Sequence, residues 1–286
     1  MAVHYNLALS AKRWMTLSDR DDDIGGRFRF FGRSPALLAD PIVQSIGFIL
    51  LVSALFLTFP AIDPWFSGLF YEPDAGFPMD RLGAFTALRG LGDWLVTATV
   101  VALVGALLIK LARPARPAPI PPGDILFLLA TLAIGPGLIV NGLFKEHWGR
   151  PRPADVYLFG GDGPLVAIWR MTDHCLSNCS FVSGEASVAI WLIAAAIIVP
   201  LRWRPPLVKL LLVVAIALSL NRIAFGRHFL SDVLLAWGLT FLVLAVMHRI
   251  IVERPPAWLG NDRLEAGLTR IGLSLRRALP GGKDSA

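Results

Sequence analysis

Six long apolar stretches, separated by short polar segments, make up the middle of the chain. Each stretch has close to the roughly 20 residues that an α-helix needs to cross a hydrocarbon core about 30 Å thick. The pattern therefore predicts an all-α, polytopic membrane protein whose six transmembrane helices form a bundle. The predicted spans are residues 42–59, 91–109, 125–144, 183–201, 207–225 and 230–252.

Proline and glycine mark the ends and bends of these spans. The proline-rich stretch 114–122 ends the second span, because proline cannot continue a helix. Gly135, Pro136 and Gly137 predict a kink within the third span. Residues 60–90 carry aromatic side chains among Pro, Gly and Asp, a composition typical of the membrane interface. We interpret them as an interfacial loop rather than a lid over a binding site.

The composition agrees with a membrane protein and not with an ordinary soluble domain. Of 286 residues, 55% are hydrophobic and 17% are charged. The net charge of +6 does not by itself indicate nucleic acid, because basic residues of a polytopic protein mark its cytoplasmic loops. With a cytoplasmic amino terminus, nineteen Lys and Arg fall inside and eight fall outside. The bias supports that orientation, and no nucleic-acid or protein partner is implied.

Two polar tails flank the predicted transmembrane domain of residues 41–254. Residues 1–40 form a basic cytoplasmic tail, in which residues 5–15 are either a helix on the membrane surface or part of a disordered segment. Residues 255–286 form a second cytoplasmic tail with Arg263, Arg270 and Arg277 seven apart. Its apolar residues recur at helical spacing, which predicts an amphipathic surface helix on anionic lipid. These are Leu264, Leu268, Ile271, Leu275 and Leu279.

The topology brings three polar blocks to the outer membrane face. The third span delivers residues 145–152 there, the fourth begins there at residues 183–185, and the fifth ends there. The planar guanidinium groups of arginine and the ammonium group of lysine are well suited to bind phosphate oxygens. The amino terminus of a helix, where Ser183 and Gly184 lie, also favours an anion. The sequence therefore predicts a phosphate site, with a cationic group formed by Lys145, Arg150, Arg152 and Arg222.

His228 and Asp232 lie beside this cationic group, between two apolar runs. If a helix starts here, residues four apart share a face, and the carboxylate can orient the imidazole. An imidazole held in this way can act as a nucleophile or a general base. A His and Asp at this spacing are also a common structural pair, so the functional interpretation depends on the neighbouring blocks.

Together the three blocks resemble the signature of the type 2 phosphatidic acid phosphatase (PAP2) superfamily. That signature is Lys, six residues and Arg-Pro, then Pro-Ser-Gly-His, then Ser-Arg, five residues, His, three residues and Asp. Lys145 and Arg152-Pro153 match the first block. The second block reads Val-Ser-Gly-Glu at residues 182–185, with two departures. The third block matches apart from Asn221 in place of Ser.

The resemblance implies a metal-independent reaction, without another cofactor, through a phosphohistidine. His228 would attack phosphorus, Asp232 would orient its imidazole, and water would then release phosphate. Glu185 stands where the family has a histidine that protonates the leaving oxygen. If it is protonated, it could serve as that acid, which is the role we expect. If it is ionised, it could position the hydrolytic water or a substrate hydroxyl, or it could tether an arginine, with His147 as an alternative acid. The residues expected to stabilise the phosphate oxygens are Lys145, Arg152, Ser183, Gly184 and Arg222.

The resemblance also implies a phosphorylated membrane lipid as the substrate. The variant second block and the Cys-bearing loop are most similar to lipid A phosphatases of Gram-negative bacteria, which act in the inner membrane with a site that faces the periplasm. Undecaprenyl diphosphate, phosphatidylglycerophosphate and phosphatidic acid are alternative substrates, and a phosphotransferase or a non-catalytic phospholipid-binding protein are alternative functions. In an oxidising periplasm Cys175 and Cys179 could form a disulfide, or they could remain buried thiols.

Overall fold

The computed structural model describes residues 40–278. Internal contacts divide the chain into residues 1–44 and 45–286. The packing described below belongs to the second unit. The predictions for the amino-terminal tail, including a surface helix at residues 5–15, lie outside the described residues, as does Leu279 of the carboxy-terminal tail.

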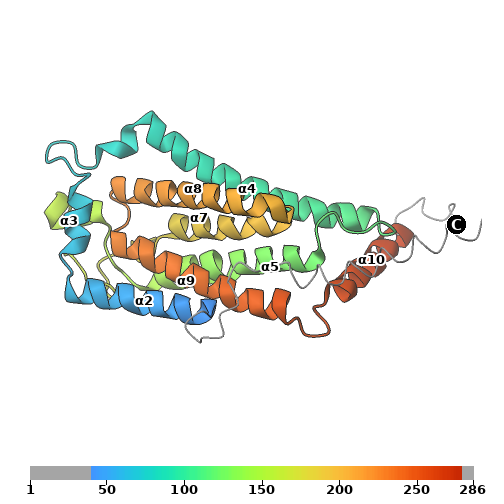
Figure 1. Cartoon of the computed structure of the whole chain (residues 1–286). Coiled ribbons are helices and arrows are strands. Elements are labelled where there is room, and N and C mark those ends of the chain that lie inside the picture. Colours follow the sequence, from blue (N-terminus) through green and yellow to red (C-terminus); the bar gives the residue numbers. More distant parts are fainter. Residues whose placement is uncertain (1–39, 279–286) are drawn as a thin grey trace, which may run out of the picture. The chain divides into compact units, whose positions relative to one another are not determined.

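The all-α prediction is confirmed, because the described residues form helices and loops and no β-strand (Figure 1). The α-helices are α2 (Pro41–Thr58), α3 (Ile62–Gly68), α4 (Gly83–Ala112), α5 (Pro122–Leu132), α6 (Lys145–His147), α7 (Gly184–Ala194), α8 (Arg204–Ala224), α9 (Leu230–His248) and α10 (Asn261–Ala278). The π-helical segments η5 (Ala133–Phe144) and η10 (Arg249–Glu253) extend α5 and α9. Short 3-10 turns are η4 (Pro78–Arg81), η6 (Pro153–Asp155), η7 (Tyr157–Phe159), η8 (Ala195–Ile198) and η9 (Leu201–Trp203).

All six predicted apolar segments are helical, but only five of the described helices are long and apolar enough to cross a membrane. The shorter one is Gly184–Ile198, formed by α7 and η8, where the sequence predicted a span over residues 183–201. It packs against α4, α5, η5, α8 and α9, and its mostly buried residues need not match the bilayer thickness. Pro200, which has no amide hydrogen to donate, follows its end.

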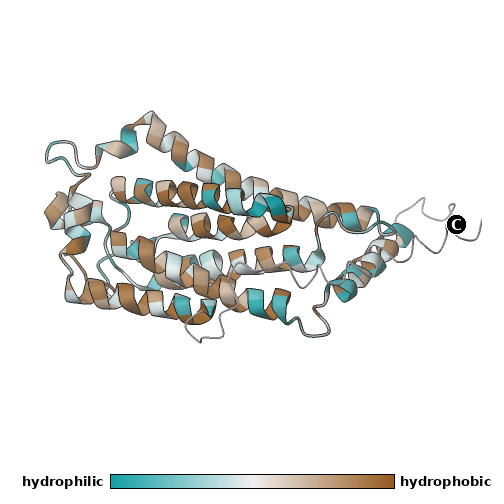
Figure 2. Cartoon of the chain, viewed as in Figure 1, coloured by the Kyte–Doolittle hydropathy of each residue, from teal (hydrophilic) through white to brown (hydrophobic). Residues whose placement is uncertain are grey.

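Many large apolar residues of the long helices are exposed. The ribbon colours of Figure 2 show apolar residues over much of the length of these helices. In the most apolar windows of Pro41–Thr58 and Gly83–Ala112, only 17% of the residues are buried inside the protein. Because such surfaces are unfavourable in water, these helices are suited to contact lipid. The outward apolar faces therefore agree with a membrane protein.

The kink predicted at Gly135, Pro136 and Gly137 falls within η5, where the helix changes to π-helical hydrogen bonding. Pro136 lacks an amide hydrogen, which frees the helix from its regular hydrogen-bond pattern here. The side chain of Asn141 donates to the Pro136 carbonyl at 2.8 Å. The wider turn continues up to Lys145, so the irregular segment leads directly into the first predicted phosphate-binding residue.

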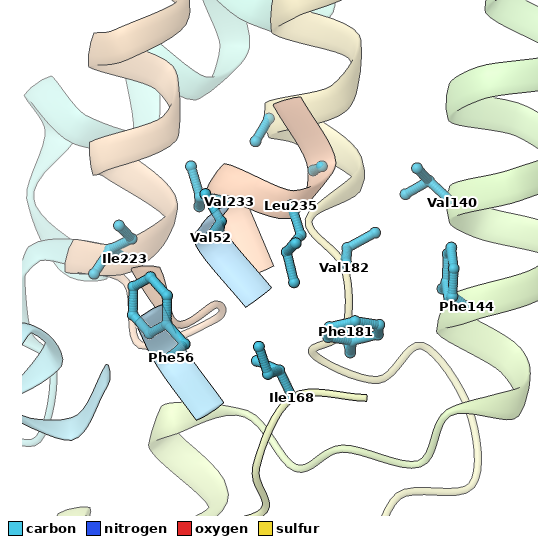
Figure 3. Packing of buried hydrophobic residues seen from close by; sticks show 12 residues of the cluster. Val52, Phe56, Val140, Phe144, Ile168, Phe181, Val182, Ile223, Val233 and Leu235 are labelled. Carbon is cyan, nitrogen blue, oxygen red and sulfur yellow. The ribbon is translucent and has the colours of Figure 1, made fainter. Parts of the chain in front are cut away.

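An apolar core supports the end of the bundle that carries the three polar blocks (Figure 3). Phe181 is completely buried, stacks on Trp148 and meets Phe144 edge to face. The adjacent Val182 belongs to the same core and immediately precedes Ser183 at the start of α7. The second polar block is therefore anchored by the tightly packed residues that precede it in the chain.

The amphipathic helix predicted in the carboxy-terminal tail is α10. It docks on the bundle through a polar stripe: Glu265 pairs with the buried Lys110 of α4 at 2.5 Å, and Asn261 accepts from the amide of Gly123 at 2.8 Å. Leu275 and Ile271, from the apolar stripe, are about half exposed. One side of α10 is thus held by protein, while its apolar side remains available to lipid.

A buried ion network connects α3, the polar loop between α6 and α7 (residues 148–183), and the start of α9. Arg150 is only 1% exposed and pairs with Asp63 of α3 at 2.7 Å and with Asp232 of α9 at 2.5 Å. It also donates to the hydroxyl of Ser231 and lies over the ring of Phe229. The prediction that Arg150 belongs to the phosphate-binding group is therefore wrong, because both carboxylates already neutralise its charge.

We predict that Arg150→Met strongly destabilises the protein. Removing the guanidinium leaves two buried carboxylates without a cation, and breaking a buried pair in this way costs about 3–5 kcal/mol. Thermal unfolding of the purified protein in detergent measures the effect. Arg170→Met, at an exposed loop position, is the matched control. Equal melting temperatures for the two variants would contradict the structural role of the network.

Candidate active site

His228 lies in the short turn between α8 and α9. Gly226 adopts a left-handed conformation (φ 63°) that lets the chain reverse after α8. His228 itself is 2% exposed, and its Nδ1 lies 2.8 Å from the carbonyl oxygen of Ser180. Since a carbonyl can only accept, Nδ1 carries the proton, and Nε2 keeps a free lone pair. This tautomer suits a nucleophilic imidazole.

The surroundings of His228 also favour its neutral form. Burial lowers the pKa of the imidazole well below its ordinary value, and the positive charges of Arg222 and Lys145 lower it further. A protonated imidazole has no lone pair to attack phosphorus. The low pKa therefore keeps His228 in the reactive form across the neutral pH range.

Asp232 does not contact His228 directly. Helix α9 begins at Leu230, after His228, so the expected i to i+4 arrangement on one helix does not exist. The carboxylate instead accepts from the Ser180 hydroxyl at 2.6 Å and from the amide of Phe229 at 2.9 Å, and it pairs with Arg150. Ser180, which the sequence reasoning missed, therefore links Asp232 to the imidazole.

The second block forms the amino terminus of α7. The Ser183 hydroxyl accepts from the amide of Ala186 and caps the helix, and the Ser183 amide donates to the carbonyl of Asp232. A Cβ at Gly184 would lie 3.2 Å from Lys145 Nζ and 2.8 Å from Asn141 Oδ1. Only glycine lets the lysine come this close to the helix start. Ser183 and Gly184 thus lie where the sequence predicted, next to Lys145.

The loop closed by Cys175 and Cys179 holds two of the basic residues. The two cysteines form a disulfide, with their Cα atoms 5.7 Å apart. Between them, Asn178 accepts from Lys145 Nζ through its side-chain oxygen at 3.3 Å and from Arg152 through its carbonyl at 2.6 Å. The sequence reasoning missed Asn178, although its place within the Cys-x3-Cys segment was a signal that the loop is constrained.

Glu185 joins two arginines. Its carboxylate lies 3.2 Å from Nε of Arg222 and 3.2 Å from Nε of Arg89. The Arg89 contact is a hydrogen bond, whereas the Arg222 contact is an ion pair without hydrogen-bond geometry. This arrangement fits the role of arginine tether better than that of general acid, and the alternative acid His147 is exposed at the end of α6.

Arg89 was not among the predicted site residues. The predicted second span began at residue 91, whereas α4 begins at Gly83 and carries Arg89 on its second turn. Its position among the eight basic residues of the outer face was the available signal. The structure therefore adds Arg89 to the three predicted basic residues Lys145, Arg152 and Arg222.

Comparison with known proteins identifies close relatives. The chain is 36% identical to a lipid A 4'-phosphatase of Rhizobium leguminosarum over 68% of its own length and 89% of the relative. It is 38% identical to a lipid A 4'-phosphatase of Rhizobium etli, covering 68% of this chain and 80% of that one. A lipid A 4'-phosphatase of Francisella tularensis subsp. novicida is 35% identical, with 68% of this chain and 90% of the relative covered.

The fold is similar to that of a solved membrane protein. The crystal structure of a transmembrane PAP2 type phosphatidylglycerolphosphate phosphatase from Bacillus subtilis aligns with a TM-score of 0.52 at 20% identity, over 76% of this chain and 98% of that one. Residues 124–256 match the model of the PAP2 superfamily and contain all three polar blocks. The resemblance seen in the sequence is thereby confirmed, and the chain belongs to the PAP2 superfamily.

Proposed function

We propose that this membrane lipid phosphatase removes a phosphate monoester from lipid A at the periplasmic face of the bacterial inner membrane, through a phosphohistidine on His228. The observation that carries the mechanism is the hydrogen bond from His228 Nδ1 to the Ser180 carbonyl, which leaves Nε2 unprotonated beside the basic residues. The names of the three relatives support lipid A as the substrate. The charge bias along the sequence supports the periplasmic face.

In the first step, the Nε2 lone pair attacks phosphorus, and the bond between phosphorus and the lipid oxygen breaks. Lys145, Arg152 and Arg222 compensate the charge on the phosphate oxygens, and the amide of Gly184 at the start of α7 can donate to them. The departing lipid oxygen takes a proton from water. In the second step, water attacks the phosphohistidine, the N–P bond breaks, and inorganic phosphate leaves with His228 restored.

In this mechanism Asp232 and Ser180 position the nucleophile without touching the substrate. Asp232 fixes the Ser180 hydroxyl, and the Ser180 carbonyl fixes the imidazole tautomer. Glu185 holds Arg222 and Arg89 next to the phosphate site. Charge compensation by these basic residues supports a reaction that needs no metal.

The proposed function predicts phosphate release from lipid A by the purified protein. Full activity is expected to persist in EDTA, since basic side chains supply the positive charge. His228→Ala is expected to abolish turnover, because the attacking nitrogen is lost. Phosphate release is measured against phosphatidic acid, phosphatidylglycerophosphate and undecaprenyl diphosphate in the same detergent. A preference for one of these three would replace lipid A as the substrate, and normal turnover by His228→Ala would exclude the phosphohistidine.

The second prediction concerns Glu185. An arginine tether contributes equally whatever the leaving group, so Glu185→Gln should lower kcat/KM by a similar factor on an alkyl phosphate and on nitrophenyl phosphate. A general acid would matter only for the alkoxide, where such catalysis is worth about 10² to 10⁴ in rate. Steady-state rates on both esters decide between the two roles. A large loss confined to the alkyl ester would restore the acid role.

The third prediction concerns the disulfide loop. Replacing both cysteines with serine should loosen Asn178 and lower kcat/KM by about tenfold, since hydrogen bonds to charged groups are worth about 1.5–3 kcal/mol. Asn178→Gly should show part of this loss, because glycine retains the left-handed backbone (φ 49°) but lacks the oxygen that accepts from Lys145. Ser177→Gly, in the same loop, is the control.

Reduction provides an independent check of the loop prediction. Dithiothreitol should lower the activity of the wild type to that of the double serine variant and should not affect the variant itself. If reduction and the double substitution both leave kcat/KM unchanged, the loop has no part in positioning the basic residues.

A further inference from the structure

A cavity of about 440 Å³ opens next to the phosphate-binding residues, between α4, η5, α7 and α8. The end of the cavity nearest the candidate active site is lined by Lys145, Gly184 and Glu185. Leu192 and Leu218, which lie further along α7 and α8 toward the middle of the bundle, line its apolar part. If the phosphate of a lipid lies against Lys145, the part of the lipid that carries this phosphate would therefore lie inside the cavity.

An acidic residue of a membrane-spanning helix also lines the cavity. Asp93 is ten residues into α4 and one turn beyond Arg89, so the two side chains share a face of the helix. Among the described residues, no hydrogen bond or ion pair is found for the Asp93 carboxylate. Charged groups within the hydrocarbon region are costly and are commonly retained to bind a ligand or partner. The mechanism above gives Asp93 no role.

Two further acceptor groups lie on the wall of this cavity. Thr97 is one turn beyond Asp93, and its hydroxyl donates to the Asp93 carbonyl at 2.8 Å, which leaves the hydroxyl oxygen able to accept. The Asn141 amide nitrogen donates to Pro136, while its oxygen lies beside Gly184. Apart from Arg89 and Lys145, the polar side chains on the wall offer acceptors, and this part of the wall is suited to a ligand group that donates hydrogen bonds.

We propose that this cavity is the subsite for the sugar that carries the phosphate, and that Asp93 accepts a hydrogen bond from a hydroxyl or amide N–H of that sugar. This inference rests on the proposed function and extends it from the phosphate to the group beside it. The phosphate-proximal part of phosphatidic acid carries ester carbonyls, which only accept, whereas an acylated amino-sugar phosphate carries donors. Asp93 thereby selects sugar phosphates over glycerol phosphates.

The test compares kcat/KM for lipid A and for phosphatidic acid in the same detergent. Asp93→Leu removes the acceptor and should lower the value for lipid A by about tenfold or more, as expected for a hydrogen bond to a charged group. The value for phosphatidic acid should change less than about twofold, because that lipid makes no such bond. Asp93→Asn retains a neutral acceptor and should recover part of the loss. Asp74→Asn, at an exposed loop position, is the control.

Other outcomes separate this inference from the function on which it rests. Equal losses on both lipids would show that Asp93 supports Arg89 or the helix, and they would overturn the subsite, as would unchanged kcat/KM. If Asp93→Leu fails to fold, Thr97→Val must show the same selective loss for lipid A, or the inference fails. A wild-type protein that releases phosphate from phosphatidic acid and not from lipid A would overturn the proposed substrate and the subsite together.

Discussion

The structure depends most on the pairing of one buried guanidinium with two buried carboxylates. Arg150 can remain charged at this depth only because Asp63 and Asp232 neutralise it. The network fixes α3 and the polar loop against the start of α9. Asp232 then holds the Ser180 hydroxyl, and the Ser180 carbonyl holds the imidazole of His228. The position of the proposed nucleophile is thus set by charged groups that pair with one another inside the protein.

The basic residues around His228 are arranged differently, since none of them is neutralised to the same extent as Arg150. Lys145 and Arg152 are held by Asn178, while Arg222 shares the Glu185 carboxylate with Arg89. These contacts fix the positions of the basic groups but leave an excess of positive charge beside a neutral imidazole. Such an excess favours binding of an anion. It is also the form of charge compensation that phosphoryl transfer requires.

The short helix α7 explains how this positive charge comes to lie near His228. Because α7 is covered by its neighbours, it can be shorter than a membrane span, and its amino terminus can lie beside Lys145. Phe181 and Val182, which belong to the apolar core (Figure 3), directly precede that terminus and anchor it. The short buried helix α7 thus forms part of the proposed phosphate site, whereas the long helices with exposed apolar faces are suited to contact lipid.

The fold class, the approximate spans and the residues of the three blocks could be predicted from the sequence, since hydrophobic length and motif spacing are local properties. Which charges are paired became clear only in the folded chain. Arg150 and Arg152 are two residues apart and look alike in the sequence, but one is neutralised by α3 and α9 while the other faces the site. The roles of Arg89, Asn178 and Ser180 likewise come from contacts between distant segments, and the pairing of charges across such segments cannot be read from residue spacing.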